Sequence, residues 1–244
     1  MTAYENKLGW QKARKVLDQR AIQGYLLSRT RDADDEPPLA LAENQQYLVY
    51  NKASWVFWGL KQYMGEEKMQ GAIRNFLQDY GSKGPLYPTT KELTDYLRAA
   101  AGPDYQQLIT DYWDRITFWE LGFGDETVKV EAKSGGGYTV TLPIKLDKKI
   151  ASEETGKETS VTEIDGEDLN EWVEIGFYDH DPKETHGDEW ISLERVRLNK
   201  PEQTPSFDMD KKPSYVLLDP RRLLIERKVT DNVKELDTKL ASAE

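Results

Sequence analysis

The spacing of apolar residues changes once along this 244-residue chain, and that change constrains the fold more than any other feature. Before the segment Gly122-Phe123-Gly124, apolar residues recur three and four positions apart, as on one face of a helix. After it, apolar and polar residues alternate, as in strands with one buried face. We therefore predict an α+β protein with two domains: an all-helical domain at residues 1–122 and an antiparallel β-sandwich at 123–235, followed by a polar tail at 236–244.

The predicted helices extend from about Trp10 to Phe118. Gly65 predicts a break, and Thr89 with Glu92 three residues later forms a capping-box pattern that predicts a helix start. Gly102-Pro103 should end that helix and begin the last one. The clearest helix has six apolar residues expected on one face: Met69, Ala72, Ile73, Phe76, Leu77 and Tyr80.

The predicted strands begin with a hairpin. Val128, Val130 and Ala132 alternate with polar residues, and the alternation resumes after the glycine turn at 135–137. Pro143 cannot donate a ladder hydrogen bond, so we expect an edge or a bulge there. Further strands are expected at 172–177, 190–198, 206–209 and 215–218, a spacing typical of a sandwich, and the polar segment 152–168 is expected to be at least partly a loop.

The composition excludes several functions. A net charge of -11 and a pI near 4.9 argue against a nucleic-acid partner, which would require a positive surface, and against an anionic membrane surface. No apolar run approaches the roughly 18 to 20 residues of a membrane helix, so we expect a soluble chain with no membrane insertion of its own. The chain has no cysteine, which leaves its compartment open.

The segment 43–53 is the strongest candidate for a functional site. Tyr47, Tyr50, Ser54 and Phe57 are expected near one face of a helix. From periodicity alone, aromatic residues at this spacing are typical of a core, with their polar tips hydrogen-bonded.

The sequence Tyr50-Asn51-Lys52-Ala53 resembles the Tyr-x-Lys-Gly element of the alanyl aminopeptidase-like gluzincins, the zinc peptidase family that includes leukotriene hydrolase. The resemblance covers roughly residues 8–235 and is closest to a bacterial branch in which an aminopeptidase-like region follows the membrane segment of an ABC-transporter permease. Further matching pieces are Glu36-Pro37-Pro38-Leu39, Gly65-Glu66-Glu67, Tyr87-Pro88-Thr89-Thr90, Asp219-Pro220 and Asp231-Asn232.

The resemblance implies that Tyr50 is catalytic, donating a hydrogen bond to the oxyanion formed at a peptide carbonyl, and that Tyr47 contacts the substrate. It also implies that the helical domain is the C-terminal part of a peptidase catalytic domain. The expected partners are then the missing N-terminal catalytic half and, in the full-length protein, a peptide substrate. The full-length protein is expected to contain zinc and to be associated with a membrane.

This chain departs from the family where zinc is bound. It has no His-Glu-x-x-His motif, and its two histidines, His180 and His186, lie in one charged segment. We therefore expect no cofactor in this chain and no activity from it alone. Ala53 also stands where the family has glycine, and Ala42-Glu43-Asn44 is a chance likeness to the family's substrate-gripping motif.

Three further segments have simpler interpretations. The acidic residues around His180 and His186 offer metal-ligand types, but a solvated loop is expected because nothing sets a coordination geometry. Residues 163–168 lack the ligand spacing of a calcium-binding loop. The basic group Arg221, Arg222, Arg227 and Lys228 is expected to pair with carboxylates across a domain contact.

Three functional classes therefore remain open. The first is a fragment of a zinc aminopeptidase that supplies Tyr50 and one wall of the peptide cleft. The second is a non-catalytic binding or scaffold domain of a transporter-associated protein, which would explain the missing ligands directly. The third is a sandwich that binds carbohydrate or calcium, with Trp172, Tyr178 and Trp190 as a sugar platform, although strand aromatics are usually buried.

Overall fold

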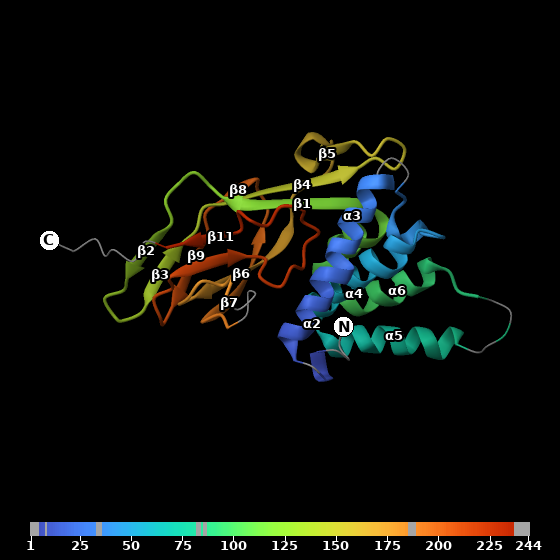
Figure 1. Cartoon of the computed structure of the whole chain (residues 1–244), viewed down its shortest axis with the longest axis horizontal. Helices are drawn as coiled ribbons and strands as arrows, with labels where there is room; N and C mark the ends of the chain where they lie inside the picture. The colour runs from blue at the N-terminus through green and yellow to red at the C-terminus, as the bar shows by residue number, and fades with distance from the viewer. Residues whose placement is uncertain are drawn as a thin grey trace. The chain divides into compact units, whose positions relative to one another are not determined.

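The computed structural model describes residues 5–7, 9–32, 36–81, 84, 87–184 and 189–236. The chain divides into two compact units. The first contains Met1–Thr117 and Ile150–Thr159, and the second contains Phe118–Lys149 and Ser160–Glu244. Helices precede antiparallel sheets along the chain (Figure 1), which confirms the predicted α+β class. The tail predicted at 236–244 lies outside the described residues except for Leu236.

The first unit is built from helices, three of which are π-helical segments. Gly65 has a φ of 89°, which a residue with a side chain rarely adopts, and it separates two long helices as predicted. In order the elements are α2 (Trp10–Val16), η1 (Leu17–Ile22), α3 (Gln23–Asp32), η3 (Leu39–Leu41), η4 (Tyr47–Lys52), α4 (Ala53–Met64), α5 (Glu66–Tyr80), α6 (Thr90–Ala101), η5 (Pro103–Tyr105), α7 (Gln106–Ile109) and η6 (Thr110–Asp114).

The predicted capping box forms at the start of α6. The Thr89 backbone N–H donates to Glu92 Oε2 at 2.7 Å, so an amide at the helix start is satisfied by the chain itself. Helix α6 ends at Gly102, whose φ is 75°, and Pro103 begins the next turn as predicted.

The apolar face predicted for α5 is only partly buried. Met69 and Ala72 are buried, but Leu77 is 57% exposed and Ile73 and Phe76 are half-buried. The core of the unit is formed instead by residues of α3, α4 and η6, with Tyr25, Trp55 and Tyr112 fully buried. The sequence pattern correctly predicted the helix but could not predict how much of its apolar face would be covered.

The second unit is built from strands, although strand residues 116–117, 150–151 and 158–159 belong to the first unit. The helical interpretation is wrong from Ile116 onward, because residues 116–123 form the first strand. The strands are β1 (Ile116–Phe123), β2 (Lys129–Ala132), β3 (Tyr138–Thr141), β4 (Ile144–Ala151), β5 (Glu158–Ser160), β6 (Glu171–Tyr178), β7 (Ser192–Leu198), β8 (Glu202–Gln203), β9 (Ser206–Met209), β10 (Tyr215–Leu218) and β11 (Val233–Glu235). The segment 152–168, expected to be partly a loop, contains β5 and a 3-10 turn at Val161–Glu163.

The described strands form three sheets. The first has the order β1-β4-β5, and β8 also pairs with β4. The second has the order β11-β10-β6-β7, and the third has the order β2-β3-β9. The predicted hairpin is confirmed: β2 pairs with β3 so that Val130 lies opposite Val140. We expected an edge or a bulge at Pro143, but the chain instead breaks there between β3 and β4, which belong to different sheets. The rings of Phe177 and Phe207 lie 5.4 Å apart and join β6 to β9 in the core.

No helix among the described residues is both long enough and apolar enough to cross a membrane.

Candidate functional site

The Tyr-x-Lys sequence lies on the π-helical segment η4. A π-helical turn is wider than an α-helical turn, and such turns are frequent at functional sites. Within η4 the exposed fractions differ sharply: Tyr50 is 70% exposed, Tyr47 is 8% exposed and Lys52 is fully buried. Within this one segment the tyrosine of the motif therefore lies at the surface and the lysine in the interior.

Lys52 is anchored in the interior by a carboxylate. Its Nζ atom lies 3.1 Å from Glu36 Oε1, which also accepts a hydrogen bond from the Tyr25 hydroxyl at 2.7 Å. Arg29 Nε lies 2.6 Å from the second oxygen of Glu36. Burial lowers the pKa of Lys52 and raises the pKa of Tyr25, whose phenolate is further disfavoured by the Glu36 charge. Through Glu36, this cluster connects Lys52 of η4 to Tyr25 and Arg29 of α3.

Tyr50 itself lies on the surface of η4. Its backbone carbonyl accepts a hydrogen bond from Ser54 Oγ at 2.5 Å, one turn later. The phenol ring is therefore held by a well-packed helix but is open to solvent, which is the accessibility that a hydrogen-bond donor to a substrate needs.

Tyr47, the predicted substrate-contact residue, has a different environment. Its ring stacks on Tyr25 with centroids 6.2 Å apart and an interplanar angle of 18°. It lines a polar hollow of 420 Å³ together with Ser28, Arg31 and residues 44–46. Tyr47 and Tyr50 thus share one helical segment but differ in exposure.

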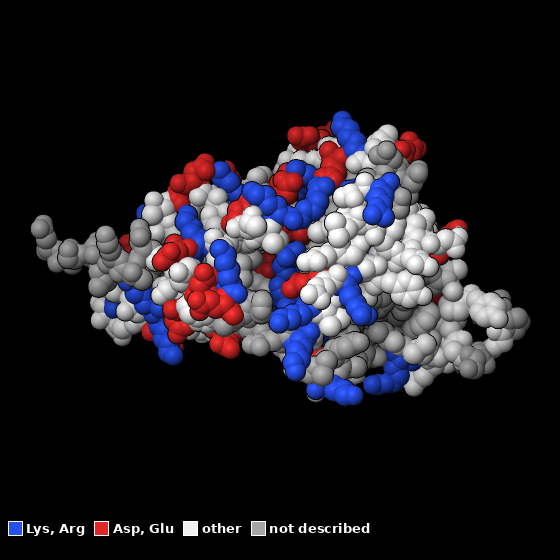
Figure 2. Space-filling view, viewed as in Figure 1, with Lys and Arg blue, Asp and Glu red and all other residues white. Residues whose placement is uncertain are grey.

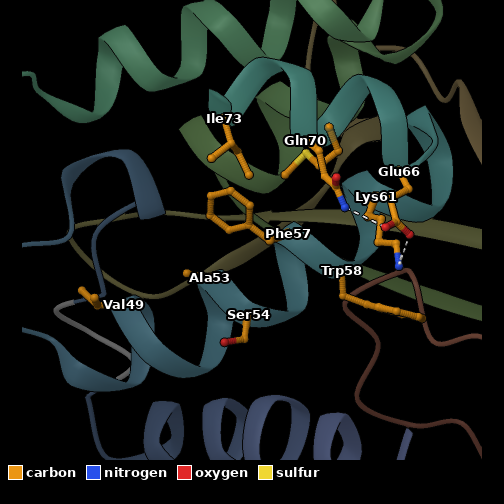
Figure 3. Close-up of a pocket in the computed structure, with 10 residues that line it drawn as sticks. Val49, Ala53, Ser54, Phe57, Trp58, Lys61, Glu66, Gln70 and Ile73 are labelled. Atoms are coloured by element: carbon orange, nitrogen blue, oxygen red, sulfur yellow. Dashed lines mark hydrogen bonds and ion pairs between the residues drawn. The ribbon is translucent and has the colours of Figure 1, made fainter. Parts of the chain in front are cut away.

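An apolar groove begins at the residues that flank Tyr50. It has a volume of 350 Å³ and lies between η4 with α4 on one side and α5 on the other (Figure 3). The residues that line it are Val49, Ala53, Ser54, Phe57, Trp58, Lys61, Glu66, Met69, Gln70 and Ile73. A further hollow that shares Gln70 and Ile73 extends along α5 to the exposed Leu77.

One end of the groove is charged. Lys61 Nζ lies 2.8 Å from Glu5 and 3.0 Å from Glu66, and Gln70 donates to Glu66 at 2.6 Å (Figure 3). Partial burial opposes the charge of Lys61, but its contacts with the two carboxylates outweigh burial and raise its pKa. The groove is therefore apolar in its middle and closed by an ion pair at this end.

Ala53 lines this groove. A close approach occurs at Gly24, where an added Cβ would lie 2.1 Å from Asn51 Nδ2. Asn51 donates from that nitrogen to the carbonyl of Arg20, so a side chain at position 24 would displace a bonded amide. The packing of η4 against α3 therefore depends on Gly24.

Among the residues that the structure describes, no three His, Cys, Asp or Glu side chains lie close enough to hold a metal ion. His180 Nδ1 lies 2.8 Å from Asp179 Oδ1, a hydrogen bond that lowers the pKa of Asp179. His186 and Asp188, which completed the candidate cluster in the sequence, lie outside the described residues.

The second unit contains buried carboxyl groups that periodicity did not reveal. Burial raises the pKa of Asp219 to about 6 and that of Glu226 to about 8, although both accept backbone hydrogen bonds, which act in the opposite direction. Glu226 accepts from the Leu121 N–H at 2.7 Å and from Asn232 Nδ2 at 2.6 Å. Asp219-Pro220 and Asp231-Asn232 stood out in the sequence only as pieces of the family resemblance, and nothing local indicated that the two segments meet, as the Leu218 N–H bonded to the Asn232 carbonyl shows.

The basic group of the second unit pairs within that unit. Arg221 Nε donates to Glu174 at 2.7 Å, and Arg195 lies 2.7 Å from the same carboxylate. Arg227 lies over the ring of Phe118, 4.6 Å from its centroid. The carboxylate pairing predicted for Arg221 is therefore present, but it links β6 to the turn after β10 and not two domains.

Comparison of the chain with protein-family models and with curated proteins finds no match in either.

Proposed function

We propose that the helical unit supplies the oxyanion-stabilising tyrosine, Tyr50, and one wall of the peptide cleft of a zinc-dependent aminopeptidase. The single observation that carries this proposal is the contrast within one π-helical segment between Tyr50, which is 70% exposed, and Lys52, which is fully buried and anchored to Glu36. Other aromatic residues expected on this helix, such as Trp58, are core residues.

The chemistry requires a donor that is already in place when charge develops. Attack on a peptide carbonyl places negative charge on its oxygen, and a preorganised donor aimed at that oxygen contributes on the order of 3 to 4 kcal/mol. We assign this role to the phenol of Tyr50, whose backbone lies in the η4 segment that Lys52 anchors to Glu36. The apolar groove beside it suits an uncharged side chain of the peptide.

The proposal assigns no zinc ligand to the described residues, because they hold no suitable group. The zinc and its ligands would lie on an N-terminal catalytic half of the full-length protein, which is the partner that this chain needs. Residues 1–244 alone would then be inactive.

The test uses the full-length protein that contains these residues. We expect about one zinc per chain and release of amino-terminal residues from alanyl-p-nitroanilide, with loss of activity on chelation and recovery when zinc is restored. A full-length protein that holds no zinc and releases nothing would contradict the proposal.

The same groove supports a second candidate, a non-catalytic binding or scaffold domain of a transporter-associated protein. The observation that favours it is an open apolar groove in a chain whose described residues offer no metal site. Peptide binding to the full-length protein that survives complete removal of metal, in the absence of hydrolysis, would favour this candidate over the enzyme.

A further inference from the structure

A hollow of 570 Å³ lies in the second unit, between strands β7 and β9. Each of these strands is at the end of the order of its own sheet among the described strands. The residues that line the hollow are Trp190, Ile191, Ser192, Glu194, Asp208, Met209, Asp210 and Lys211. None of them belongs to the tyrosine site or to its groove.

The polar lining residues come from alternate positions of the two strands. Ser192 and Glu194 are two residues apart in β7, and Trp190 lies two residues before that strand begins. Asp208 lies in β9, and Asp210 follows two residues later, just after the strand ends. Side chains two apart in a strand lie on the same side. Met209, which is 7% exposed, and Ile191 occupy intervening positions on the opposite side of each strand but also line the hollow, so residues from both sides of the two strands border it.

Two of the carboxylates are held in place. Asp208 accepts from Thr139 Oγ1 at 2.7 Å and lies 2.9 Å from Lys133 Nζ, and Glu194 accepts from Ser192 Oγ at 2.5 Å. The bonds to Thr139 and Lys133 lower the pKa of Asp208 and keep it ionised at neutral pH. Figure 2 shows acidic side chains gathered over the strands of this unit, with basic side chains between them.

The lining therefore combines three carboxylates with one ammonium, an indole and two apolar residues, Ile191 and Met209. A net negative hollow attracts a cation, and an indole ring is the best aromatic partner for one. The two apolar residues suit a ligand whose charge is carried on a methylene stem, since such stems pack along apolar surface while the charged end stays polar.

We propose that this hollow binds the lysine or arginine side chain of an extended peptide segment. The methylene stem would lie on Ile191 and Met209, with the cationic end near Trp190, Glu194 and Asp210. The extended segment would add to one of β7 and β9, each of which is the terminal strand of its sheet among the described residues. This site is independent of the proposed peptidase function.

The test is isothermal titration of residues 1–244 with the peptide acetyl-Thr-Val-Thr-Arg-Thr-Val-Thr-amide. Its control has citrulline in place of arginine, which keeps the shape and removes the charge. We expect the arginine peptide to bind, the citrulline peptide to bind at least about tenfold more weakly, and Asp210→Asn and Trp190→Ala each to weaken arginine-peptide binding about tenfold. Because Asp210 is exposed, its variant should fold even if the Trp190 variant does not.

The matched control is Glu126→Gln, which removes one exposed carboxylate of the same unit outside the hollow and should leave affinity unchanged. Equal weakening by Glu126→Gln and Asp210→Asn would overturn the site in favour of diffuse attraction to an acidic protein. The proposal would also be overturned if the arginine peptide showed no binding at a concentration of about 1 mM. Equal affinity for the arginine and citrulline peptides would overturn it as well.

Discussion

Lys52 Nζ lies 3.1 Å from Glu36 Oε1, and both side chains are completely buried. Removing one partner of a buried ion pair leaves the other charge without full compensation, which typically costs about 3 to 5 kcal/mol. Because Arg29 also contacts Glu36, we expect Lys52→Met to lower the free energy of unfolding by about 3 kcal/mol, the lower end of that range. Urea unfolding followed by circular dichroism measures this change.

The control for that substitution is Lys91→Met, which breaks an exposed ion pair with Asp95 on α6 and should leave the unfolding midpoint unchanged. If Lys52→Met also leaves the unfolding midpoint unchanged, the cluster around Glu36 does not anchor η4.

Tyr50→Phe should reduce kcat of the full-length enzyme by about a hundredfold or more, because it removes one preorganised donor to the oxyanion. The ring is 70% exposed, so the free energy of unfolding should hardly change. Steady-state kinetics and thermal unfolding together check this expectation. An unchanged kcat would remove Tyr50 from the mechanism.

Val49→Asp places a charge at the apolar groove, and we expect it to raise KM for peptides with a large apolar residue by about tenfold, with a smaller effect on kcat. Leu27→Asp is the matched control, since Leu27 is 68% exposed on α3 and does not line the groove. Equal effects of the two substitutions would argue that the groove does not contact the substrate.

Gly24→Ala should destabilise the protein by about 1 to 3 kcal/mol, because the new methyl group would overlap the Asn51 amide. Adding Asn51→Ala should recover part of that loss in a double-mutant cycle. Gly71 on α5 is the contrasting position: nothing lies within 4 Å of an added Cβ, so Gly71→Ala should stabilise by about 0.5 to 1 kcal/mol. A Gly24→Ala protein as stable as the parent would contradict the close contact between Gly24 and Asn51.

Stability should fall as pH rises from about 4 to about 8. Asp219 and Glu226 have folded-state pKa values of about 6 and about 8, above their ordinary values of 3.8 and 4.5, so the folded state binds more protons than the unfolded state in this interval. Their contribution is fully present below the unfolded pKa values and is lost as pH passes through the folded ones.

Glu226→Gln should flatten this pH dependence between pH 6 and 8, whereas Glu163→Gln, at an exposed position, should not. Unfolding in urea at a series of pH values is the measurement. An unchanged slope in Glu226→Gln would mean that another group titrates in this range.

The sequence by itself determined the order of helices before strands, the start of α6 after Thr89 and the pairing of β2 with β3. Each depends on residues close together in the chain, through periodicity, capping or a turn. The same local information mispredicted Ile116 as helical, because a short apolar run fits either structure.

Tertiary structure alone decided which residues of these elements are exposed. Tyr47, Tyr50 and Lys52 follow one another on a single segment, yet only contacts with distant Tyr25, Arg29 and Glu36 make the lysine buried and leave Tyr50 at the surface. The hollow between β7 and β9 likewise joins residues from two sheets. Such sites depend on desolvation and packing between segments far apart in the sequence, which periodicity does not encode.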